Sequence, residues 1–130
     1  MVDSLNKDWH DKTILIAEDE GSNFKYLEIA LRKTGVNILH ARNGKEAIEI
    51  TKERSDLELI LMDIKMPEMD GLEATKAIRT FNSDIIIVAL TAYAMENDRD
   101  MSIEAGCNDY IAKPVHQNRL FSVLAKFLDE

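Results

Sequence analysis

The chain has 130 residues, of which 45% are hydrophobic and 31% are charged, and its formal net charge is −8. This length provides one hydrophobic core, so a single domain is expected. The negative charge argues against direct nucleic-acid binding, which depends on clustered Lys and Arg. No apolar run reaches the roughly 20 residues of a bilayer span, and the polar N-terminus lacks the apolar middle of a secretion signal. The single cysteine excludes an internal disulfide and fits a reducing compartment.

A polar segment precedes the first predicted strand. Residues 1–12 contain Trp9 and His10 among polar and charged side chains, and we expect a leader that forms a linker or a frayed end. From Thr13 onward, short apolar runs alternate with longer segments of helical periodicity. We therefore place one domain in residues 13–130.

Five short apolar runs are predicted to be strands, at residues 13–17, 37–41, 58–62, 84–90 and 108–112. Helices are predicted at residues 22–33, from Asn43 onward, and at 70–81, 95–105 and 116–128. Residues 85–90 are apolar throughout, which is typical of a parallel strand covered on both faces. The fourth helix has a thin apolar stripe, so we expect it to be loosely held. Five βα units with right-handed crossovers predict a three-layer α/β sandwich, (βα)5.

Polar side chains end four of the predicted strands. They are Glu18 and Asp19 after the first strand, Asp63 after the third, Thr91 after the fourth and Lys113 after the fifth. Taken singly, each has an ordinary explanation, such as an acid at a helix N-terminus, a turn-forming Asp or a solvated Lys. The carboxyl ends of parallel strands share one edge of the sheet, however, and ligands bind there in open α/β folds. We therefore expect these groups to converge on one site.

These residues, in this order, resemble the receiver domain of two-component response regulators, also called the CheY-like domain. The strings that carry the resemblance are MDIKMPEMDG at residues 62–71, ALTA at 89–92 and AGCNDYIAKP at 105–114. The resemblance runs from about Thr13 to Phe127. It implies a flavodoxin-like fold whose parallel strands lie in the order 2-1-3-4-5.

The resemblance implies that Asp63 accepts a phosphoryl group from a phosphohistidine. It also implies that Mg²⁺, or Mn²⁺, is held by Asp19 and Asp63, with Glu18 nearby, and by the backbone carbonyl of Lys65. Mg²⁺ prefers such a set of few carboxylates plus phosphoryl and water oxygens.

Further roles follow from the resemblance alone. Lys113 is expected to pair with the acceptor carboxylate and then with a phosphoryl oxygen, and Thr91 to donate its hydroxyl to another. Thr91 and Tyr110 are expected to form the conformational switch. Lys65 and Tyr93 occupy positions that tune the lifetime of the acyl phosphate in the family. Their bulk leads us to expect slow dephosphorylation.

The implied partner is the phosphohistidine of a histidine kinase or of a histidine phosphotransfer domain. Docking is expected around Ser22, Asn23 and the residues after Pro114. Asn23 and the strings above are most like receivers of hybrid sensor histidine kinases, which is the context we expect; a stand-alone single-domain regulator is the alternative. The domain is expected to be a signalling phosphoacceptor rather than an enzyme, and to lie in the cytoplasm, free or tethered to a membrane-bound sensor kinase. We expect it to contact neither nucleic acid nor membrane directly, and to offer its fourth helix, fifth strand and fifth helix as a dimer face.

Two other functions share parts of this pattern. A flavodoxin-like FMN carrier has the same strand order, but it needs a phosphate-binding loop of Ser, Thr and Gly where this chain has Glu18, Asp19 and Glu20. It remains a distant alternative. A haloacid-dehalogenase-type phosphatase needs a second Asp two residues after its nucleophile, where this chain has Lys65.

Overall fold

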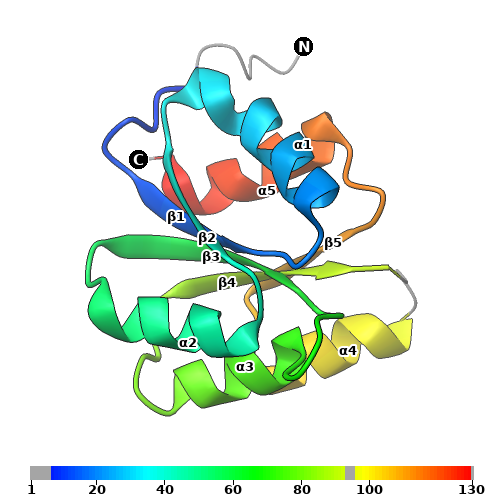
Figure 1. The fold of residues 1–130 in the computed structure, drawn as a ribbon. Coiled ribbons are helices and arrows are strands. Elements are labelled where there is room, and N and C mark those ends of the chain that lie inside the picture. The colour runs from blue at the N-terminus through cyan, green and yellow to red at the C-terminus, as the bar shows by residue number, and fades with distance from the viewer. Residues whose placement is uncertain (1–6, 93–95, 130) are drawn as a thin grey trace.

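The computed structural model describes residues 7–92 and 96–129. Its elements are β1 (Thr13–Ala17), α1 (Gly21–Leu31), η2 (a 3-10 helix, Arg32–Thr34), β2 (Asn37–Ala41), α2 (Gly44–Glu53), β3 (Leu57–Asp63), α3 (Gly71–Arg79), β4 (Ile86–Thr91), α4 (Glu96–Ala105), β5 (Asp109–Ala112) and α5 (Gln117–Leu128). Figure 1 shows α1 and α5 on one face of the sheet and α2, α3 and α4 on the other. This arrangement confirms the predicted three-layer sandwich. None of the described helices is long and apolar enough to span a membrane.

The sheet is parallel, with its strands in the order β2-β1-β3-β4-β5, as predicted. Successive residues of β1 face opposite ways. Ile14 and Ile16 belong to the core that includes α1 and α5, whereas Leu15 and Ala17 belong to the core that includes α2 and α3. Because helices cover both faces, every residue of β1 is buried.

Side-chain caps begin two of the helices. At α3, the backbone N–H of Glu73 donates to Asp70 Oδ1 at 2.8 Å and that of Asp70 donates to Glu73 Oε1 at 3.2 Å, a reciprocal capping box. At α2, Asn43 Oδ1 accepts from the N–H of Glu46 at 2.9 Å, but Glu46 Oε1 accepts from the N–H of Arg42 instead. Of these two helices, α3 alone has the reciprocal box.

The first helix ends in a tighter turn than predicted. The α-helical part stops at Leu31, and residues 32–34 continue as the 3-10 helix η2. Gly35 then takes φ 75°, a left-handed conformation that favours glycine and ends the segment where the sequence indicated.

The fourth helix has little apolar surface to bury. Met101 and Ile103 are 46% and 50% exposed, while Ser102 and Ala105 are buried. The predicted start at Met95 lies outside the described residues. The loose attachment of α4 that we expected from its thin apolar stripe stays a prediction.

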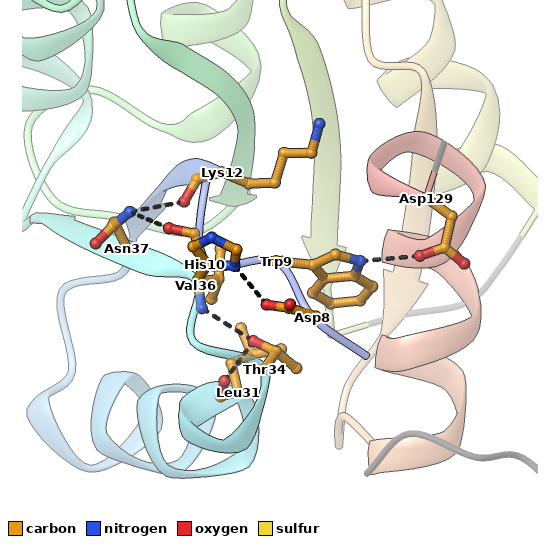
Figure 2. Close-up of polar contacts among 9 residues, drawn as sticks. All are labelled: Asp8, Trp9, His10, Lys12, Leu31, Thr34, Val36, Asn37 and Asp129. Atoms are coloured by element: carbon orange, nitrogen blue, oxygen red, sulfur yellow. Dashed lines mark hydrogen bonds and ion pairs between the residues drawn. The ribbon is translucent and has the colours of Figure 1, made fainter. Parts of the chain in front are cut away.

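Residues 7–12, called the strap below, pack against the domain. Trp9 is 2% exposed and belongs to the core that includes α1 and α5, with its ring 6.2 Å from that of Phe121. Its indole Nε1 donates to Asp129 Oδ1 at 2.9 Å (Figure 2), and Lys7 forms an ion pair with the same carboxylate at 2.5 Å. The expectation of a linker or frayed end is therefore wrong for residues 7–12. Burial of one large indole outweighs the polar composition around it.

Backbone hydrogen bonds hold the strap along its length. The N–H of Trp9 donates to the carbonyl of Thr34 at 2.8 Å, and the N–H of Asn37 donates to the carbonyl of Lys12 at 2.9 Å. The side-chain amide of Asn37 donates to the carbonyls of both His10 and Lys12, each at 3.1 Å (Figure 2). The strap is thereby joined to both ends of the η2–β2 connection.

The strap leads to a prediction about stability. Replacing Trp9 with Ala should lower the free energy of unfolding by about 3–5 kcal/mol, because it empties a large core site. Urea unfolding followed by circular dichroism measures this. The matched control is His10→Ala in the same segment, an exposed site where the change should stay within about 0.5 kcal/mol. Equal unfolding midpoints for Trp9→Ala and the unaltered chain would show that the strap adds nothing to the core.

Candidate functional site

Four strand ends place the predicted polar residues at one edge of the sheet. The register pairs Ala17 with Met62, Asp63 with Leu90 and Thr91 with Ala112. The residues that end or follow these strands are therefore neighbours. The structure brings together all five that the sequence singled out, namely Glu18, Asp19, Asp63, Thr91 and Lys113.

Lys113 bridges two of the acids. Its Nζ lies 3.1 Å from Asp63 Oδ2 and 3.5 Å from Glu18 Oε1. The Asp63 and Glu18 side chains are 4% and 1% exposed, whereas that of Lys113 is 25% exposed. Removing one member of such a buried ionic group leaves a charge without compensation, so the three side chains depend on one another. The backbone of Lys113 is also anchored, because its N–H donates to the carbonyl of Thr91 at 2.7 Å.

The acids outnumber the ammonium that faces them. Oxygens of Glu18, Asp19 and Asp63 all lie within 4.8 Å of one another. Burial, the negative charge of Asp63 and a hydrogen bond with Asp63 together raise the pKa of Glu18 to about 7. Burial acts to lower the pKa of Lys113, but the hydrogen bond and charge of Asp63 and the charge of Glu18 outweigh it and raise that pKa. The site is therefore short of positive charge.

The loop after β3 folds back onto the end of that strand. The N–H of Lys65 donates to Asp63 Oδ1 at 3.3 Å, and the N–H of Gly71 donates to the carbonyl of Ile64 at 2.8 Å. A Cβ on Gly71 would lie 2.2 Å from the carbonyl oxygen of Asp63, a distance at which atoms collide. Only glycine allows this close approach, which sets the start of α3 directly beside the site.

An open cleft lies beside the acids. Its lining includes Asp19, Lys65, Thr91 and Met101, so it reaches from the β1 end to α4. Thr91 is 3% exposed and Lys65 is exposed.

Two further side chains, Tyr110 and Tyr93, were predicted to act in the switch and on the phosphate lifetime. Tyr110 is half-buried on β5 and packs against the core that includes α2 and α3. Tyr93 lies outside the described residues. The peptide bond between Lys113 and Pro114 is cis.

Sequence reasoning missed one side chain that reaches the site. His40, on β2, places its Nε2 2.8 Å from the carbonyl oxygen of Glu18. The three histidines are scattered along the chain without metal-ligand spacing, so spacing did not single out His40. The predicted strand order held a signal: it sets β2 beside β1, and His40 is one residue from the end of β2.

Comparison with known proteins agrees with this geometry. The family model described as the response regulator receiver domain matches residues 14–125. A hybrid signal transduction histidine kinase I of Dictyostelium discoideum is 39% identical over 129 residues, which is 90% of this chain but 7% of that protein. The polar-differentiation response regulator DivK of Brucella anthropi is 34% identical over 121 residues, covering 92% of this chain and 98% of DivK.

Solved structures of receiver domains have a fold similar to that of this chain. The receiver domain of Saccharomyces cerevisiae Ssk1, crystallised with the histidine phosphotransfer protein Ypd1, has a TM-score of 0.86 and 36% identity, over 91% of this chain and 89% of that one. The receiver domain of the sensor histidine kinase PA1611 from Pseudomonas aeruginosa PAO1, with a magnesium ion coordinated in its active-site cleft, has a TM-score of 0.82 and 35% identity, over 92% of this chain and 98% of that one. With the family model covering most of its length and an acidic cluster at the expected edge of the sheet, the chain belongs to the response regulator receiver domain family of two-component signalling.

Proposed function

We propose that Asp63 is the phosphoacceptor of this receiver domain and takes its phosphoryl group from a phosphohistidine. The observation that carries the proposal is the buried Asp63 carboxylate at the open edge of the sheet, 3.1 Å from Lys113 and grouped with two further acids. A carboxylate oxygen of Asp63 attacks phosphorus as the P–N bond of the phosphohistidine breaks. The electron pair of that bond stays on the imidazole nitrogen.

Lys113 and Thr91 stabilise the transferred group in this proposal. Lys113 balances the Asp63 carboxylate before transfer and a phosphoryl oxygen after it, as a point charge on a flexible stem. Thr91 ends the strand next to Asp63 and lines the cleft, so its hydroxyl can donate to a second phosphoryl oxygen.

The donor set of this chain fits a hard divalent cation. Three carboxylates carry up to −3 and the phosphoryl group adds roughly −2, against +1 from Lys113. Asp19 and Asp63, with Glu18 nearby and the backbone carbonyl of Lys65, would hold Mg²⁺ or Mn²⁺. When bound, the ion neutralises charge on the phosphoryl oxygens. The magnesium ion in the PA1611 receiver supports this assignment.

The response to phosphorylation is assigned to Thr91 and Tyr110. Movement of Thr91 towards the phosphoryl group would open space into which the half-buried ring of Tyr110 can turn. Swinging a two-state equilibrium from 1:99 to 99:1 takes about 5.5 kcal/mol. New charge-assisted hydrogen bonds from Thr91 and Lys113, at roughly 1.5–3 kcal/mol each, supply much of that difference.

The partner surface that we propose lies beside the site, on α1 and the β5–α5 loop. The hydroxyl of Tyr26 donates to the carbonyl of Val115 at 2.8 Å, which links the two segments. Tyr26 and Ile29 are 44% and 52% exposed, so this face presents apolar area. A histidine phosphotransfer domain docked there would bring its phosphohistidine to Asp63. The Ssk1 receiver crystallised with Ypd1 supports a partner of this kind.

The context that we propose is a hybrid histidine kinase in the cytoplasm, on the strength of the Dictyostelium relative. The alternative is a stand-alone single-domain regulator; DivK, a response regulator, is matched over 98% of its length. A second face, formed by α4, β5 and α5, is proposed as a dimer contact; Ile103 on α4 is 50% exposed.

Phosphorylation of Asp63 is tested by intact-mass analysis after incubation with acetyl phosphate and Mg²⁺. One added phosphoryl group is expected, and it should be absent from Asp63→Asn, which keeps the size of the side chain but lacks the nucleophilic carboxylate. If no group adds from acetyl phosphate, a phosphorylated histidine phosphotransfer protein is used as donor. Equal labelling of the variant would assign the chemistry to another residue.

Magnesium should stabilise the fold. At a hundred times its dissociation constant the ion adds about 2.7 kcal/mol by mass action, which raises the melting temperature. Asp19→Asn should remove most of that rise, whereas Asp84→Asn, an exposed acid at the other end of the sheet, should keep it. A melting temperature that does not respond to Mg²⁺ in the unaltered chain would contradict the metal site.

The acyl phosphate should be long-lived. We attribute this to Lys65 and Tyr93, whose bulk hinders the attacking water. Replacing both with Ala should shorten the lifetime, measured as loss of the phosphorylated mass over time after donor removal. An unchanged lifetime in the double variant would refute the assignment.

A further inference from the structure

A histidine on the edge strand bonds to the turn that carries two of the acids. The register pairs His40 with Ile16, so His40 lies beside the end of β1 that leads into this turn. Its Nε2 is 2.8 Å from the carbonyl oxygen of Glu18. A carbonyl oxygen only accepts hydrogen bonds, so His40 donates from Nε2.

The imidazole ring is also held on its face. The ring of Phe24, in the first turn of α1, stacks on it with centroids 3.7 Å apart and an interplanar angle of 13°. Phe24 is partly buried against the core that includes α1 and α5. The ring of His40 is thus positioned by a stacked neighbour from the helix that follows the acids, and it points its donor at the turn between that helix and β1.

Both the N–H and the C=O of Glu18 are hydrogen-bonded to β2. The N–H of Glu18 donates to the carbonyl of Ala41 at 2.9 Å, and its C=O accepts from His40. That C=O belongs to the same planar peptide unit as the N–H of Asp19. Fixing the carbonyl therefore fixes the plane from which Asp19 extends, and it holds two acids close to Asp63 although like charges repel.

We propose that His40, supported by Phe24, is a positioning residue for the cation site: it orients the Glu18–Asp19 peptide so that both carboxylates face Asp63. The inference rests on the proposed function, because the site it organises is the one assigned there to Mg²⁺. His40 lies outside the strand ends that carry the acids. In this proposal it acts through the backbone of Glu18 and is not itself a metal ligand.

The test compares two replacements of His40. His40→Leu removes the donor, and His40→Gln keeps an N–H donor on a side chain of similar reach. The Mg²⁺ dissociation constant is measured by calorimetry, and the amide resonances of Glu18 and Asp19 are followed by NMR in metal-free protein. His40→Leu should weaken Mg²⁺ binding about tenfold, the scale seen when groups that orient metal ligands are lost. It should also shift both amide resonances, and His40→Gln should restore most of the affinity.

A matched control and a second variant separate positioning from general stability. His10→Leu removes an exposed imidazole at the other end of the sheet and should leave the Mg²⁺ dissociation constant unchanged. Phe24→Leu, which loses the stacked ring, should weaken binding in the same direction but less.

The outcomes also separate this inference from the function on which it rests. Unchanged Mg²⁺ affinity in His40→Leu, or equal weakening in His40→Leu and His40→Gln, overturns the inference alone. An unaltered chain that binds no Mg²⁺ overturns the proposed cation site itself.

Discussion

The carboxylates of Glu18, Asp19 and Asp63 repel one another at one edge of the sheet, and the ammonium of Lys113 opposes that repulsion. Asp63 and Glu18 are almost fully buried, where a charge without a partner is costly, and Lys113 contacts both. Burial and the negative charge of Asp63 raise the pKa of Glu18, the direction expected where carboxylates crowd together. A site built this way is suited to a divalent cation and, with that cation in place, to a phosphoryl group. In the proposed function, the shortage of positive charge favours binding of the cation, and the bound cation then favours the phosphoryl group.

The sandwich supplies the rigidity that this crowding needs. The three central strands, β1, β3 and β4, are buried on both faces and hydrogen-bonded to one another. The residues at their carboxyl ends are therefore held at fixed separations. The close approach of Gly71 to Asp63 fixes the loop on one side of the site. On the other side, β2 holds the backbone of Glu18 through Ala41 and His40. Of the two residues proposed to respond, Tyr110 is less buried than this frame, and a half-buried ring can move at lower energetic cost.

The two ends of the sheet carry different structural features. The carboxyl edge carries the acids and the open cleft, whereas the strap lies next to the start of β1 and β2 and reaches the end of α5 through Trp9 and Asp129. The contact between Lys7 and Asp129 brings the two ends of the described chain together. Anchoring them away from the cleft leaves the proposed partner face on α1 and the β5–α5 loop free of the strap.

The order of the strands and helices could be predicted from the sequence, and so could the bounds of each strand to within two residues. This is because hydrophobic periodicity is local and both faces of the sheet are covered. The sequence also indicated that Asp63, Thr91 and Lys113 would meet, since polar residues that end parallel strands share one edge. Tertiary packing decided the place of Trp9: its neighbours in the chain are polar, and its ring is buried against residues far along the chain, such as Phe121. It likewise decided the contact between His40 and Glu18. Each of these contacts joins residues of separate elements that meet only once those elements have packed, so no local pattern in the chain encodes it.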